Sequence, residues 1–156
     1  MGYSHSFMII DRNTRWPEAT PGRQQTAESC MKALIDWVSR HGVPQYISDR
    51  WANFTPTLWS SPTASLGTKL IHTTAYNPAA NSMVERLHLS LKSALASRLQ
   101  GDSWRKELPQ VLLGLRSTPY AAFNASAAKA LHSQALTIPS DIFQDTKKPT
   151  TLPDIR

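Results

Sequence analysis

Two acidic residues occupy settings that suit metal-dependent chemistry. The sequence contains only eleven Asp and Glu residues, so the candidates are few. Asp49 ends the short apolar run 46–48, which predicts a buried parallel strand with an acid at its carboxyl end. Glu85 lies in the first turns of the clearest predicted helix. Because Mg²⁺ prefers hard oxygen donors, Asp49 and Glu85 are candidate metal ligands.

Asp11 also ends an apolar run and is a third candidate. One interpretation makes its carboxylate a further metal ligand. The other makes it a turn-capping acid that binds the backbone of residues 12–14. The residues alone leave both interpretations open.

Basic residues lie beside the two leading acids. Glu85, His88 and Lys92 fall at i, i+3 and i+7, so they share one helical face opposite a stripe of leucines. Lys92 and His88 either contact DNA phosphates there or form part of a solvated face. Arg50 and Arg86 directly follow the acids and serve either phosphate contact or local ion pairing.

The elements that must position these side chains alternate between strands and helices. Predicted strands cover 8–11, an edge segment at 16–21, 46–49 and 69–73. Predicted helices cover 26–40, 55–66 (interrupted by a proline), 81–99, 104–115 and 125–131. This alternation predicts an α/β layer fold.

Composition narrows the class of protein. A net charge of +6 and a pI near 9.8 favour a polyanionic partner. The one cysteine, Cys30, excludes an internal disulfide and the usual zinc knuckles, and its helical spacing predicts a buried thiol. No apolar run is long enough to span a membrane. Glycine-rich phosphate loops and nucleophile elbows are absent, which argues against a small-molecule substrate.

Five short motifs occur in one order along the chain. They are Arg15-Trp-Pro-Glu-Ala, Ile47-Ser-Asp-Arg, Thr74-Ala-Tyr-Asn-Pro, Val84-Glu-Arg-Leu-His and Val111-Leu-Leu-Gly-Leu-Arg. Together they resemble the catalytic core of gypsy-type long-terminal-repeat retrotransposon integrases, which are relatives of retroviral integrases. The resemblance covers residues 7–143, and we expect a core-like domain over 3–143 and a flexible tail over 144–156.

The resemblance implies a ribonuclease H-like fold, a mixed sheet flanked by helices. In that family three acidic residues hold two Mg²⁺ (or Mn²⁺) ions for in-line displacement at phosphorus. By resemblance, Asp49 matches the second acid, Glu85 the third, and Lys92 a DNA-contacting lysine. The resemblance also implies DNA as partner, homo-oligomers and a nuclear location.

The first acid of the family lies on a preceding strand. The motifs align Asp11 with the next strand, where an aspartate is not a ligand, so the resemblance favours the turn-capping interpretation. We therefore expect this chain to lack the first strand and the first acid, and to be inactive and poorly stable by itself. The alternative function is a non-catalytic DNA- or protein-binding remnant. Further departures from the family pattern are Trp51, Pro62, Ala79 and Ser82.

Overall fold

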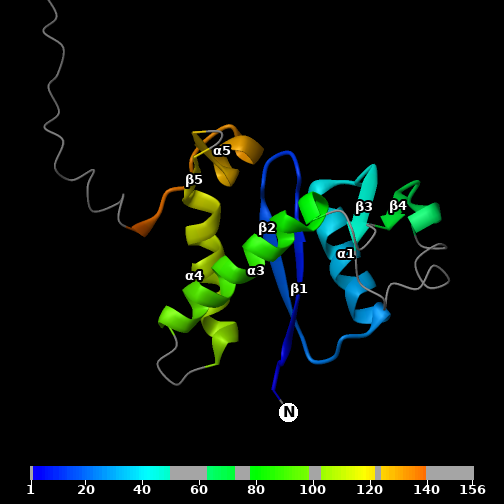
Figure 1. The fold of residues 1–156 in the computed structure, drawn as a ribbon, viewed down its shortest axis with the longest axis horizontal. Helices are drawn as coiled ribbons and strands as arrows, with labels where there is room; N and C mark the ends of the chain where they lie inside the picture. The colour runs from blue at the N-terminus through cyan, green and yellow to red at the C-terminus, as the bar shows by residue number, and fades with distance from the viewer. Residues whose placement is uncertain (1, 50–62, 73–77, 99–102, 122–123, 140–156) are drawn as a thin grey trace, which may run out of the picture.

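A computed structural model describes residues 2–49, 63–72, 78–98, 103–121 and 124–139 (Figure 1). The elements are, in order, β1 (His5–Ile10), β2 (Pro17–Gly22), α1 (Ala27–His41), β3 (Tyr46–Asp49), β4 (Lys69–His72), α3 (Pro78–Arg98), α4 (Trp104–Ser117), β5 (Pro119–Tyr120), β6 (Ala125–Ser126) and α5 (Ala127–His132). Every strand and helix predicted within these ranges is confirmed, and only the short pair β5 and β6 was not predicted. The helix predicted over 55–66 and the tail over 144–156 lie mostly or wholly outside the described residues.

The described strands form three separate pairs instead of one sheet. β1 pairs with β2 antiparallel, β3 with β4 parallel, and β5 with β6 antiparallel. The parallel and antiparallel pairs expected of a mixed sheet are therefore present, but in the described part of the chain no strand joins β1 to β3. This difference is the one the expected lack of a first strand would produce.

The β1–β2 hairpin lies between two helical layers. Figure 1 shows α3 and α4 on one side of the hairpin, and α1 with β3 and β4 on the other. Successive strand residues point to opposite faces. Phe7 and Ile9 accordingly pack on the α1 side, whereas Met8 packs against α3 and α4. β1 is thus covered by apolar side chains on both faces.

Local signals fix the ends of α1. Thr26 is the N-cap, and its hydroxyl accepts a hydrogen bond from the Ser29 N–H. Gly42 ends the helix at φ +83°, a conformation that favours glycine, and donates its N–H to the Val38 carbonyl. Cys30 is buried within the core that α1 forms with β1, as predicted.

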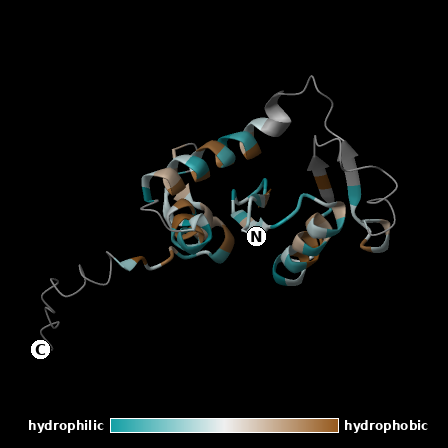
Figure 2. Ribbon diagram, turned by 90° about the horizontal axis from the view of Figure 1, so that it is seen from below, coloured by the Kyte–Doolittle hydropathy of each residue, from teal (hydrophilic) through white to brown (hydrophobic). Residues whose placement is uncertain are grey.

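The long helix α3 is amphipathic. Leu87 and Leu91 are buried, and Leu91 packs with Leu108, Val111 and Leu112 of α4. In Figure 2, apolar and hydrophilic residues alternate along α3. Burying one stripe against α4 holds the opposite stripe outward. No described helix is both long enough and apolar enough to cross a membrane.

Candidate metal-ligand positions and nucleic-acid interface

Asp49 is the last residue of β3, as predicted. β3 runs parallel to β4 and pairs Asp49 with His72, so both strands end at the same edge. The carboxyl end of a parallel strand is where α/β folds place their chemistry. The structure describes the backbone of Asp49, while Arg50 and Trp51 lie outside the described residues.

The outward stripe of α3 carries the other predicted residues. Glu85, Arg86, His88 and Lys92 are all exposed, while Leu87 between them is buried. The predicted shared face is therefore present, available to a ligand in solvent. Among the described residues, no group of three or more His, Cys, Asp or Glu side chains lies close enough to hold a metal ion.

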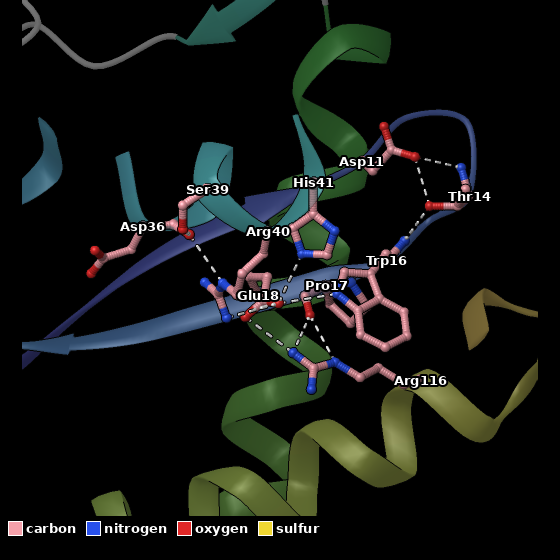
Figure 3. Close-up of polar contacts among 10 residues, drawn as sticks. All are labelled: Asp11, Thr14, Trp16, Pro17, Glu18, Asp36, Ser39, Arg40, His41 and Arg116. Atoms are coloured by element: carbon pink, nitrogen blue, oxygen red, sulfur yellow. Dashed lines mark hydrogen bonds and ion pairs between the residues drawn. The ribbon is translucent and has the colours of Figure 1, made fainter. Parts of the chain in front are cut away.

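Asp11 is engaged in its own turn. One oxygen of its carboxylate, Oδ2, accepts hydrogen bonds from the Thr14 N–H at 2.8 Å and the Thr14 hydroxyl at 2.6 Å (Figure 3). The Asp11 N–H donates to the Trp16 carbonyl, and Arg15 completes the turn with φ +64°. The turn-capping role is confirmed by these bonds, which account for the acid at this position.

A buried carboxylate dominates the polar contacts of the core. Glu18 is 9% exposed and lies on β2. Its Oε1 accepts a hydrogen bond from the Trp16 indole N–H at 3.1 Å and lies 3.5 Å from the Arg40 guanidinium. Its Oε2 lies 3.1 Å from the guanidinium of Arg116, and the His41 ring nitrogen Nε2 is 3.4 Å from Oε1. Figure 3 shows these groups converging from β2, α1 and α4.

Arg116 does more than balance this charge. Its Nε and Nη2 both donate to the Pro17 carbonyl, at 3.1 and 3.0 Å. Its guanidinium also lies 4.4 Å from the centroid of the Trp16 ring, a cation–π contact. A planar guanidinium with several fixed donors can make all these contacts at once, whereas a lysine could not.

Burial and neighbouring charge act in opposite directions on Glu18. Burial alone would raise the pKa of the Glu18 carboxyl. The Trp16 hydrogen bond, the charges of Arg116 and Arg40, and the His41 contact outweigh it, so this pKa lies below its ordinary value of 4.5. Burial also lowers the pKa of the Arg116 guanidinium, which nevertheless remains charged at neutral pH.

This cluster explains two of the sequence motifs. Arg15-Trp-Pro-Glu-Ala supplies Trp16, Pro17 and Glu18, and Val111-Leu-Leu-Gly-Leu-Arg supplies Arg116. The motifs are distant in sequence and meet in space. Sequence reasoning quoted both motifs without predicting that they touch; the only available signal was an apolar motif carrying one acid and another carrying one base.

Related sequences are segments of retroviral polyproteins. The chain is 33% identical over 122 residues to the Gag-Pol polyprotein of avian reticuloendotheliosis virus, covering 76% of the chain and 11% of that protein. It is 32% identical over 123 residues to the Gag-Pol polyprotein of feline leukemia virus, covering 76% of the chain and 7% of that protein. The chain thus spans a small part of the curated relatives it matches. No family model matches the sequence.

Solved structures decide the fold. The catalytic core domain of HTLV-2 integrase, in complex with magnesium, matches at a TM-score of 0.67 with 17% identity, covering 81% of this chain and 84% of that one. The fold is that of a retroviral integrase catalytic core. A chain of the simian T-cell lymphotropic virus intasome, in complex with a PP2A regulatory subunit, gives a TM-score of 0.72 with 18% identity, covering 96% of this chain and 52% of that one. The predicted ribonuclease H-like α/β fold is confirmed, with retroviral proteins as the relatives.

The Glu18 cluster yields a stability prediction. Glu18→Gln keeps the shape of the side chain but leaves Arg116 buried without its counter-charge, which we expect to lower the free energy of unfolding by about 3 kcal/mol. Urea unfolding at pH 7 measures this change. Glu107→Gln, which breaks the more exposed pair with Arg98, is the matched control and should cost less than about 1 kcal/mol.

The same pair of variants gives a pH dependence. Because the folded-state pKa of Glu18 is lowered, its carboxylate stabilises the fold fully above pH 4.5. That contribution is lost as the pH falls through the folded-state pKa. The stability difference between the wild type and Glu18→Gln should therefore shrink in acid, and a difference that stays constant from pH 7 to pH 3 would contradict the assignment.

Proposed function

We propose that this chain is an integrase-type core segment that acts on DNA in strand transfer, the joining step of DNA integration. One observation carries the proposal: a sequence related to retroviral Gag-Pol polyproteins adopts the integrase core fold and retains an acid at the end of β3 and another on the outward stripe of α3. The strongly basic composition agrees with a nucleic-acid partner.

Asp49 and Glu85 are the proposed metal ligands. Their carboxylates are the donor type that suits Mg²⁺ or Mn²⁺, so the donor chemistry fits the metal. When bound, such ions stabilise charge on the attacking and leaving oxygens at a phosphate. Asp11 is excluded from the proposed set because its carboxylate caps the turn at Thr14.

Two carboxylates are one fewer than the resemblance requires. We propose that these 156 residues alone bind divalent cations weakly and do not transfer DNA strands. The alternative function, a non-catalytic DNA- or protein-binding module, is favoured by the same observation, that no three ligand side chains meet among the described residues. Strand-transfer products from this chain with Mg²⁺ and duplex DNA, lost in Asp49→Asn, would reject the alternative and the proposed inactivity together.

Lys92 is the proposed principal DNA contact, with His88, Arg86 and Arg50 beside it. Lys92 lies two turns after Glu85 on the exposed stripe of α3, so a phosphate held by the carboxylates' metal ions would lie near its ammonium group. The finer lineage, a gypsy-type retrotransposon, and a nuclear location belong to this proposal and are supported by the motifs alone.

DNA binding tests the basic stripe. Lys92→Ala should weaken binding to duplex DNA uniformly across sequences and reduce the slope of log affinity against log salt by about 1. Fluorescence anisotropy with labelled duplexes at several salt concentrations measures both quantities. Lys32→Ala, at an exposed position of α1, removes the same charge away from the stripe and should leave the slope nearly unchanged. Equal effects of the two variants would contradict a defined interface.

Metal binding tests the acidic pair. We expect Mn²⁺ binding, followed by water proton relaxation, to weaken at least tenfold in Asp49→Asn and in Glu85→Gln, because each removes one of two charged oxygen ligands. Asp36→Asn on the exposed side of α1 is the matched control and should bind as the wild type does. If Asp36→Asn and Glu85→Gln lose binding equally, the cation is held only by general surface charge.

A further inference from the structure

β1 has an open edge although both of its faces are covered. β2 occupies one edge of β1, and in the described part of the chain no strand occupies the other. Strands buried on both faces normally lie inside a sheet, with neighbours on both edges. Edges left open in folded proteins are usually shortened, charged or covered. β1, with the sequence His-Ser-Phe-Met-Ile-Ile, is mostly apolar and carries none of these protections.

The register of the hairpin shows which backbone groups face the open edge. In an antiparallel pair, opposed residues alternate between hydrogen-bonded and non-hydrogen-bonded pairs. The Asp11 N–H donates to the Trp16 carbonyl, which makes this a bonded pair. Continuing the alternation, Phe7 and Ile9 bond to β2, and the groups of Ser6, Met8 and Ile10 point away from it.

The prolines of β2 support this phase independently. Pro17 stands opposite Ile10, and Pro21 stands opposite Ser6. A proline has no N–H to donate, so it fits only where no donor is needed toward β1. The Pro17 carbonyl likewise accepts from Arg116 instead of from β1. The hydroxyl of Ser6 is also buried without a hydrogen-bond partner among the described residues.

A second open edge lies on β3, covered by the same helix. Among the described residues β3 pairs only with β4. Ile47 of β3 packs on the cluster of Cys30 and Leu34 in α1, which also receives Phe7 and Ile9 of β1. α1 therefore holds both open edges against one apolar surface, as its position beside β3 and the hairpin in Figure 1 illustrates.

We propose that the open edges of β1 and β3 bind one extended apolar strand from a separate polypeptide segment, which joins the two strand pairs into one sheet. Its amide groups would pair with those of Ser6, Met8 and Ile10, and apolar side chains on both of its faces would meet the α1 cluster and the α3–α4 cluster. A second copy of the folded chain fits less well, because its own β1 is already covered by helices. This inference rests on strand pairing and holds or fails independently of the DNA chemistry.

Amide hydrogen exchange on the full chain tests the proposal residue by residue. The probe is a synthetic seven-residue peptide with five alternating valines and isoleucines between terminal lysines. The control peptide carries proline at alternate positions, so it cannot pair along both edges. At about ten times its dissociation constant, the first peptide should slow exchange at Ser6, Met8 and Ile10 about tenfold beyond any change with the control peptide. Phe7 and Ile9, bonded to β2, are the internal reference.

Each remaining outcome has a defined meaning. If the isolated chain shows no protection anywhere, protection at all five positions that appears only with the valine–isoleucine peptide supports the proposal. Failure of that peptide to protect Ser6, Met8 and Ile10 overturns it. Full protection of these three amides in the dilute chain without peptide also overturns it, because the chain then covers its own edge. Protection that rises with protein concentration alone assigns the edge to a second copy and likewise overturns it.

Discussion

The contact between Glu18 and Arg116 is the constraint on which the arrangement of layers depends. It joins β2 to α4 across most of the sequence, and Arg40 and His41 bring the end of α1 to the same carboxylate. A buried ion pair contributes little net stability, because desolvation offsets much of the attraction. Its importance is geometric: removing either partner leaves a buried charge unpaired, so the hairpin, α1 and α4 have to meet in one way.

That geometry determines which face of α3 is available to a ligand. α4 is held against β2 by Arg116, and α3 then buries its leucine stripe against α4. Glu85, His88 and Lys92 remain on the solvent side as a consequence of this packing. The exposed functional stripe and the buried ion pair are thus two results of the same helix placement, although no functional side chain touches Glu18.

The sequence predicted the elements better than their assembly. Apolar periodicity located α1, α3 and α4 to within a few residues, because amphipathic helices carry their pattern locally. The capping role of Asp11 was also predictable, since its partner Thr14 is three residues away. The Glu18–Arg116 pair was not, because nothing in a local pattern states which distant base a buried acid meets. The separate strand pairs likewise depend on which neighbours each edge finds.

The central functional claim is that Asp49 and Glu85 bind one divalent cation beside DNA. A crystal structure of the chain with duplex DNA and Mn²⁺ tests it most directly, because manganese is located by its anomalous scattering. The account predicts an anomalous peak coordinated by the carboxylates of Asp49 and Glu85, next to a DNA phosphate and within reach of Lys92. A peak held by Asp11 instead, or the Asp49 and Glu85 carboxylates too far apart to share an ion, would contradict it.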